Sequence, residues 1–247
     1  MNPSAPLLTH YASSVLYLTL NRPKKLNCLD QEMLLALEAR LAEAESDDAV
    51  RAVVLQGAGE RAFSSGADLK AFGALSEDEL PQWIALGHRV FNQVATYPKP
   101  TVAVIRGYAM GGGLELALAC DLRIATEDAL LALPELQHGW LPGWGGLLRL
   151  PRLVGEARAK EMILLGERLT AAQAHRWGLI NRVCSAAELE TATEQLTEAL
   201  SALSPSAVRL AKSGLHSASV VSQEVIAFDG LALQQLLREK DRERPNR

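Results

Sequence analysis

The sequence contains little cysteine, and its cysteines form no metal-binding pattern. Among its 247 residues are Cys28, Cys120 and Cys184, whose spacing matches no set of metal ligands. Three cysteines are also a poor basis for a disulfide framework, so we expect reduced thiols that pack as small hydrophobic groups. The sequence therefore predicts no metal centre and argues against a disulfide-stapled secreted domain.

Long hydrophobic runs and blocks of positive charge are missing as well. No apolar run reaches the roughly 18 residues that a membrane-spanning helix needs. The first residues, MNPSAPLLTHYASS, place no basic segment ahead of an apolar core, so no signal peptide is expected. The net charge is −4, and no cluster of Lys and Arg stands out before the C-terminal end, which argues against a nucleic-acid-binding protein. We expect a cytoplasmic protein without membrane or nucleic-acid partners.

Several common active-site motifs are also absent. The chain has no HExxH pair and no Ser/His/Asp order, and its glycine-rich stretch 107–113 has neither GxGxxG spacing nor a Gly-Lys-Ser/Thr sequence. That stretch nevertheless follows a predicted strand and opens a predicted helix. Glycines there let a ligand approach the backbone, and free N–H groups at a helix start favour negative charge. A developing oxyanion on a substrate would be stabilised at such a place.

The length and a hydrophobic content of 48% predict one α/β domain with a helical appendage. Strands are predicted at 15–20, 51–57, 101–107, 122–125 and 130–134. Helices are predicted from the Asp30 cap to about residue 45 and from about 84 to 95, and the alternation indicates right-handed crossovers. Residues 153–240 are expected to be almost wholly helical, with capping boxes at 170–173 and 185–188.

Glu115 stands in the first turn of an apolar predicted helix within YAMGGGLELALAC (108–120). Glutamate is rarely buried unless it is paired or has a function. Beside an oxyanion site it can exchange protons near neutral pH, and the alternative is a helix-start carboxylate paired with a neighbour.

Glu135 is a second acid in an apolar stretch, and the pattern leaves open whether it is a solvated loop residue. The loop 66–68 can supply a second backbone donor, although an ordinary turn explains it equally well.

Four segments together resemble the crotonases, the enoyl-CoA hydratase/isomerase superfamily. They are LNRPKKLNCLD (20–30), AFSSGADLKAF (62–72), KPTVAVIRGYAMGGGLELALACDLRIAT (99–126) and LPELQHGWLPGWGGLLRLPRLVG (133–155), and LTAAQAHRWGLINRV (169–183) continues the likeness. The resemblance implies an α/β fold, a crotonase-like spiral of ββα turns with a C-terminal helical oligomerisation region. It divides the chain into a catalytic core over 1–195 and a helical region over 196–247, and it implies a homotrimer or a dimer of trimers.

The same resemblance assigns site residues. It places two oxyanion-hole donors on the backbone N–H groups of Ala67 and Gly112, which would hold the thioester oxygen of an acyl-CoA. Two glutamates flank a water in hydratases of this family, and they fall on Glu115, which activates the water, and Glu135, which passes a proton to the α-carbon. Gly143 matches a backbone donor near that water. The further residues expected to bind substrate or coenzyme A are Gly66, Asp68, Leu69, Lys70 and Gly111. No cofactor is implied beyond the coenzyme A of the substrate.

The presence of both glutamates favours an enoyl-CoA hydratase, which adds water reversibly to a 2-enoyl-CoA. A Δ3-Δ2 enoyl-CoA isomerase, or another enolate-forming enzyme such as a decarboxylase, is the alternative, and a non-catalytic scaffold or RNA-binding relative is the remote one. The chain departs from the family at Leu147-Leu148, where Thr-Gln is frequent, and at Trp144, where small residues are common. Trp140 and Trp144 are therefore the candidates for lining the acyl pocket.

The C-terminal end carries a second departure from the family. The resemblance implies that the chain ends before the last helix with which relatives cover coenzyme A. Five cations are crowded there, namely Arg238, Lys240, Arg242, Arg244 and Arg247. They either form a solvated helix end or meet coenzyme A phosphates in a neighbouring subunit.

Overall fold

The structure is a computed structural model that describes residues 5–217, 230 and 234. The cations of the C-terminal end therefore lie outside the described residues, as does most of the region predicted over 196–247. The boundary of that region and its role in oligomerisation stay predictions. In the described part of the chain, no helix is both long and apolar enough to cross a membrane.

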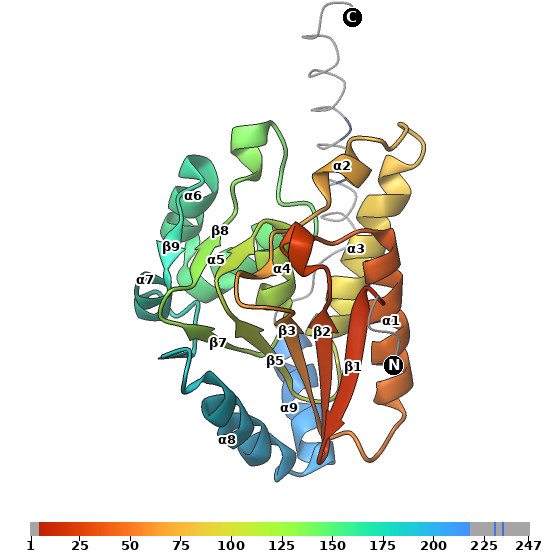
Figure 1. Cartoon of the computed structure of the whole chain (residues 1–247), viewed down its shortest axis with the longest axis vertical. Helices are drawn as coiled ribbons and strands as arrows, with labels where there is room; N and C mark the ends of the chain where they lie inside the picture. Colours follow the sequence, from red (N-terminus) through yellow and green to blue (C-terminus); the bar gives the residue numbers. More distant parts are fainter. Residues whose placement is uncertain (1–4, 218–229, 231–233, 235–247) are drawn as a thin grey trace, which may run out of the picture.

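A six-stranded sheet forms the centre of the molecule (Figure 1). Its strands, in spatial order, are β1 (Leu7–Ala12), β2 (Val15–Leu20), β3 (Ala52–Gly57), β5 (Thr101–Ile105), β7 (Leu122–Thr126) and β10 (Arg182–Cys184). The pair β1–β2 is antiparallel, and each later pair is parallel. Parallel strands are usually buried on both faces, which explains the uninterrupted apolar runs at 52–55 and 102–105.

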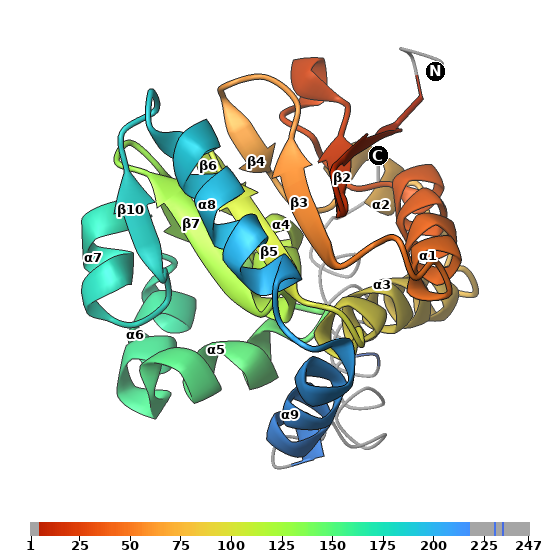
Figure 2. The same cartoon turned by 90° about the horizontal axis from the view of Figure 1, so that it is seen from below.

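The two faces of this sheet bury alternate residues of each strand. On β3, Val53 and Leu55 join the main hydrophobic core, whereas Val54 packs into a smaller cluster on the opposite face together with Leu196 of α8 (Leu189–Ser201). Figure 2 shows α8 on one side of the sheet and α1 (Gln31–Glu45), α3 (Leu80–Ala95) and α4 (Gly112–Ala119) on the other. Because successive side chains of a strand point to opposite faces, each strand of the sheet can pack against a helix layer on both sides.

The helix ends follow local sequence signals. The side chain of Asp30 caps α1 by accepting a hydrogen bond from the N–H of Met33 at 3.0 Å, as predicted. Helix α3 begins at Leu80, one turn before the prediction, because Pro81 occupies its first turn, where a missing N–H costs nothing. Within residues 5–217, the remaining helices are η1 (Pro23–Lys25), α2 (Leu69–Phe72), η2 (Glu135–His138), α5 (Gly146–Val154), α6 (Glu156–Leu165), α7 (Ala171–Arg176) and α9 (Pro205–Ser217).

A second sheet contains β4 (Ala62–Ser64), β6 (Tyr108–Met110), β8 (Leu130–Ala132) and β9 (Leu169–Thr170). The chain passes from the first sheet to the second and then into a helix three times: β3–β4–α2, β5–β6–α4 and β7–β8 followed by η2 and α5. These repeats confirm the predicted spiral of ββα turns. Because β4, β6 and β8 are parallel neighbours, the loops that follow them meet at one edge of the sheet.

The prediction missed five strands, namely β1, β4, β6, β9 and β10, of which β4 and β6 are three-residue strands within the two glycine-containing loops. Strand β1 pairs with β2 through a tight turn at Ser13, whose φ is +52°, so the turn carries no Gly or Asn that would have marked it. Residues 153–240 were expected to be almost wholly helical, but β9 and β10 interrupt them. Both have only two or three residues, and they are stabilised by pairing with β8 and β7 rather than by a pattern of their own. The two predicted capping boxes are confirmed by reciprocal hydrogen bonds.

Candidate active site

A cavity of about 130 Å³ opens at the edge of the second sheet where β4, β6 and β8 end. Most residues that the sequence assigned to the site line it, although they come from distant parts of the chain. They are Gly66, Ala67, Leu69, Gly111, Gly112, Glu115, Glu135, Trp140, Gly143 and Trp144. The spiral therefore gathers three loops and the start of α4 around one space.

The loop after β4 leaves one backbone donor available. The N–H of Gly66 donates to Oγ of Ser64 at 3.2 Å, and that of Asp68 donates to the carbonyl of Leu29 at 2.8 Å. Between them, the N–H of Ala67 donates to no group in the described part of the chain. A short parallel bridge between Leu29 and Ala67 fixes this backbone. The N–H of Ala67 is thus held in place by the backbone of Leu29 and remains available to a substrate.

The second donor lies at the start of α4. Gly111 takes φ +53°, a conformation that favours glycine, and Gly112 is the first helical residue, whose N–H has no acceptor within the helix. A Cβ on Gly66 would lie 3.0 Å from the nitrogen of Gly112, and a Cβ on Gly112 would lie 3.6 Å from the nitrogen of Ala67. The two loops are therefore in contact, and glycine at both positions permits this approach.

Glu115 is buried at 2% exposure in the first turn of α4. Its Oε1 accepts hydrogen bonds from the backbone N–H groups of Trp144 at 2.8 Å and Gly146 at 2.7 Å. A Cβ on Gly146 would lie 2.9 Å from Cβ of Pro142 and 3.0 Å from the same oxygen, so glycine permits this close approach. The two N–H groups fix Oε1 of Glu115 as a hydrogen-bond acceptor, and the residue lines the cavity.

Arg149 holds the loop that carries these two donors. Its buried guanidinium donates from Nη1 to the carbonyl of Trp144 at 2.8 Å and from Nη2 to Oδ1 of Asn92 at 2.5 Å. Burial lowers the pKa of Arg149 to about 10, which the charge of Glu115 opposes, so the group stays cationic at neutral pH. Arg149 thereby anchors the peptide between Trp144 and Gly145, which lies between the two N–H groups that bind Glu115.

Glu135 begins η2, directly after the loop that follows β8. Burial, and then repulsion from the Glu115 carboxylate, raise the pKa of Glu135 to about 8. Its buried Oε2 has no hydrogen-bond partner among the described residues. Glu135 is thus no solvated loop residue, and it presents a protonated carboxyl group to the cavity at neutral pH.

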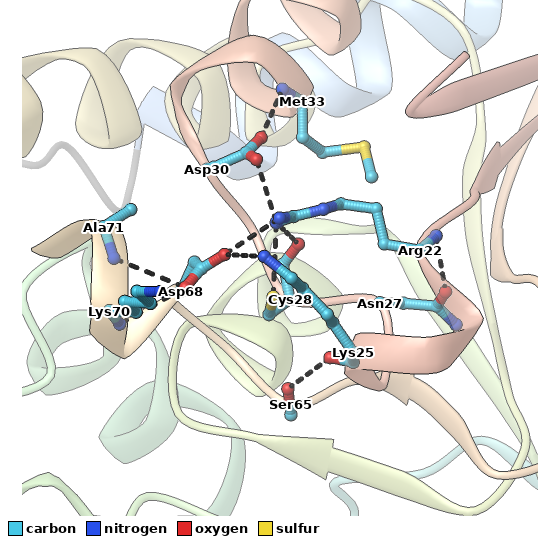
Figure 3. A network of polar contacts seen from close by, with 10 residues as sticks. All are labelled: Arg22, Lys25, Asn27, Cys28, Asp30, Met33, Ser65, Asp68, Lys70 and Ala71. Atoms are coloured by element: carbon cyan, nitrogen blue, oxygen red, sulfur yellow. Dashed lines mark hydrogen bonds and ion pairs between the residues drawn. The ribbon is translucent and has the colours of Figure 1, made fainter. Parts of the chain in front are cut away.

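A network of charges supports the loop of Ala67 from outside the cavity (Figure 3). Oδ2 of Asp68 accepts from Arg22 Nη2 at 2.9 Å and Lys25 Nζ at 3.2 Å, and Arg22 also pairs with Asp30 at 2.9 Å. Burial opposes the charge on Asp68, but the hydrogen bonds from the two cations outweigh it and hold the pKa of Asp68 well below its usual range. Asp68 and the exposed Lys70 do not line this cavity, and their contact with coenzyme A stays a prediction.

Sequence reasoning missed part of the cavity wall. Phe72, Trp83, Ile84 and Leu141 line it, and the sequence analysis assigned none of them to the site. The contacts of Glu115 were missed too, and the one signal for them was the glycine pair 145–146, which marks a close approach of the backbone. Within residues 5–217, no cluster of three or more His, Cys, Asp or Glu side chains could hold a metal ion.

Comparison with known proteins points to one family. The family model described as enoyl-CoA hydratase/isomerase matches residues 10–244. YngF of Bacillus subtilis is 44% identical over 226 residues, which are 91% of this chain and 87% of that protein. The short-chain-enoyl-CoA hydratase of Clostridium acetobutylicum is 38% identical over 202 residues, 82% of this chain and 77% of that one.

A solved structure shares the fold. The crystal structure of an enoyl-CoA hydratase from Bacillus anthracis superposes with a TM-score of 0.84 at 35% identity, covering 97% of this chain and 92% of the other. The chain belongs to the enoyl-CoA hydratase/isomerase family, the crotonase superfamily.

Proposed function

We propose that the chain is an enoyl-CoA hydratase that adds water reversibly to the double bond of a 2-enoyl-CoA thioester. The observation that carries the proposal is the pair of carboxyl groups, Glu115 and Glu135, which line one cavity with two available backbone donors. Relatives named short-chain-enoyl-CoA hydratase and crotonyl-CoA hydratase, each 38% identical to this chain, support the same reaction.

The backbone N–H groups of Ala67 and Gly112 form the oxyanion hole. Both donors are held by the fold, and neither needs to leave another acceptor before it binds the substrate. When water adds to the β-carbon, negative charge moves to the thioester oxygen, and the two N–H groups stabilise the resulting enolate. Fixed donors of this kind stabilise a transition state because no reorganisation is required during the reaction.

Glu115 and Glu135 divide the proton transfers between them. The carboxylate of Glu115, held at Oε1 by two amides, takes a proton from the attacking water. Glu135, whose pKa is raised to about 8, carries a proton at neutral pH and gives it to the α-carbon of the enolate. The oxygen–β-carbon and α-carbon–hydrogen bonds form as the α,β π bond breaks, while one proton passes from the water to Glu115 and one from Glu135 to the α-carbon. Proton exchange with solvent then returns Glu115 to the carboxylate and Glu135 to the protonated form. Reversal of these steps is dehydration.

The substrate brings the only cofactor-like group, its coenzyme A. The enolate charge is carried by the oxyanion hole, so the proposed reaction uses no metal ion or redox cofactor. We further propose that the protein works as a homotrimer or a dimer of trimers, as the resemblance to the family implies, and that it works in the cytoplasm.

The test is a panel of enoyl-CoA thioesters followed by thioester absorbance and by product mass. Gain of one water in the product supports the hydratase. An unchanged mass with a moved double bond would identify the isomerase instead, and loss of CO2 from a carboxylated acyl-CoA would identify a decarboxylase. Glu115→Gln is the control that separates enzymatic from spontaneous hydration.

A further inference from the structure

The indole of Trp144 forms a wall of the cavity that holds the two glutamates. Its side chain is 4% exposed and lines the same space as Ala67 and Gly112. The backbone N–H of Trp144 binds Glu115 at 2.8 Å, so the position of the ring is tied to that of the carboxylate. A substrate whose double bond reaches Glu115 therefore brings its acyl chain close to this indole.

Two glycines make room for the ring. A Cβ on Gly87, in the middle of α3, would lie 2.0 Å from Nε1 of Trp144, and a Cβ on Gly112 would lie 2.7 Å from Cζ3. The indole thus spans the space between α3 and α4. Glycine in a helix interior lowers the stability of the helix. At position 87 it is explained by the indole of Trp144, which occupies the space that a Cβ would need.

Other aromatic rings hold the indole in this position. The Trp83 ring lies 5.3 Å from that of Trp144, measured between centroids, and the Phe91 ring lies 5.2 Å away in an edge-to-face arrangement. Trp83 and Phe91 both belong to α3. Such pairs add attraction to the packing of the buried rings, so Trp144 does not rotate aside to admit a longer chain without losing these contacts.

We propose that Trp144 sets the acyl-chain specificity: it closes the cavity between α3 and α4 and restricts the enzyme to short 2-enoyl-CoA substrates. This inference rests on the proposed function, because it assigns the acyl group of that substrate to this cavity. Replacing the indole by a smaller side chain opens the space between the helices to the end of a longer acyl chain.

The experiment compares the wild type with Trp144→Leu on 2-butenoyl-CoA and 2-octenoyl-CoA. The expected result is an increase of about tenfold or more in the ratio of kcat/KM for octenoyl to that for butenoyl. The matched control is Trp140→Leu, which removes the same volume from a wall where the ring packs against Phe72 instead. Its ratio should change less than about threefold.

A binding measurement makes the test independent of the chemistry. Calorimetry with butyryl-CoA and octanoyl-CoA should show the same relative gain for the longer chain in Trp144→Leu. Trp144→Phe keeps a ring between the helices and should give an intermediate ratio, so it serves if the leucine variant does not fold. Circular dichroism and oligomer size check each variant.

Three outcomes would overturn the proposal: a wild type that prefers the octenoyl chain, an unchanged ratio in both Trp144 variants, or an equal gain in Trp140→Leu. Wild-type protein that binds the two saturated thioesters but hydrates neither enoyl-CoA would refute the proposed hydratase, whereas the binding ratio would still decide the role of Trp144. Protein that binds neither thioester would refute both.

Discussion

The backbone nitrogen of Gly146 lies 2.7 Å from Oε1 of Glu115, although 31 positions separate the two residues. This contact joins the first turn of α4 to the first residue of α5, and Arg149 fixes the loop just before α5 by binding the carbonyl of Trp144. The carboxylate is thus oriented by main-chain groups, which makes its position a property of the fold rather than of one neighbouring side chain.

Glu115→Gln should lower the turnover of enoyl-CoA hydration by about 100-fold or more, because an amide cannot take the proton from water. The amide oxygen can still accept from Trp144 and Gly146, so circular dichroism, oligomer size and acyl-CoA affinity should barely change. Steady-state kinetics on 2-butenoyl-CoA provides the measurement. Near wild-type turnover in this variant would remove Glu115 from the mechanism.

The raised pKa of Glu135 predicts how hydration depends on pH. The proton that goes to the α-carbon is present below the pKa of about 8 and absent above it, so kcat/KM for hydration should fall as the pH rises through this value. A profile of kcat/KM from pH 6 to pH 10 tests this. A flat profile across pH 8 would contradict the assignment of Glu135 as the proton donor.

The same carboxyl group predicts a change of stability with pH. Between the ordinary glutamate pKa of 4.5 and the raised value of about 8, the folded protein keeps a proton that the unfolded chain has released. The free energy of unfolding should therefore decrease as the pH rises through this window. Urea unfolding at pH 5 and pH 8 should show that Glu135→Gln gains stability relative to the wild type at the higher pH.

Gly112→Pro removes one donor of the oxyanion hole and should cost about 3–4 kcal/mol of transition-state stabilisation. Proline is tolerated at the first position of a helix, but its Cβ would lie 2.7 Å from Cζ3 of Trp144. Gly112→Ala is the matched control, because it introduces the same Cβ and keeps the N–H. The difference in kcat/KM between the two variants measures the donor, and equal values would mean that the N–H of Gly112 does not bind the substrate.

The local parts of this arrangement were predictable from sequence, whereas its long-range contacts were not. The glycine-rich start of α4 and the buried Glu115 follow from a pattern within a few residues. The environment of Glu135 depends on the pairing of β6 with β8, which brings Gly111 close to it: a Cβ on that glycine would lie 3.1 Å from Oε1 of Glu135. The burial of Glu135 could therefore not be predicted from the polarity of the residues next to it in the sequence.

Trp144 illustrates the same limit. Its place in the cavity was predicted because it departs from the small residues usual in the resembling segment. Its contact with Gly87 was not predicted, because an isolated glycine in a helical stretch indicates only reduced helix propensity. Strand β10 was missed for the related reason that a three-residue strand depends on its neighbour β7.

Asp68→Asn should weaken the support of the oxyanion-hole loop. The substitution removes the charge that Arg22 and Lys25 bind, and the loss of charged hydrogen bonds should lower the free energy of unfolding by about 2 kcal/mol at pH 7. Because folding depresses the pKa of Asp68, its contribution is present above the ordinary carboxyl pKa and is lost as the pH falls below it. The stability difference between wild type and variant should therefore shrink toward acid pH in urea titrations.

The catalytic effect separates a positioning role for Asp68 from a purely structural one. Asp68 directly follows Ala67 in the chain, and the carboxylate of Asp68 anchors this loop to Arg22. Removing the anchor should displace the N–H of Ala67, so kcat should fall by a larger factor than KM rises. Asp30→Asn is the matched control: it loses an ion pair to the same Arg22, keeps a side chain that can cap α1, and lies outside the loop. Asp30→Asn should lose less stability than Asp68→Asn, because it loses one ion pair rather than two, and kcat should fall only in Asp68→Asn. An equal kcat in both variants would show that Asp68 does not position Ala67.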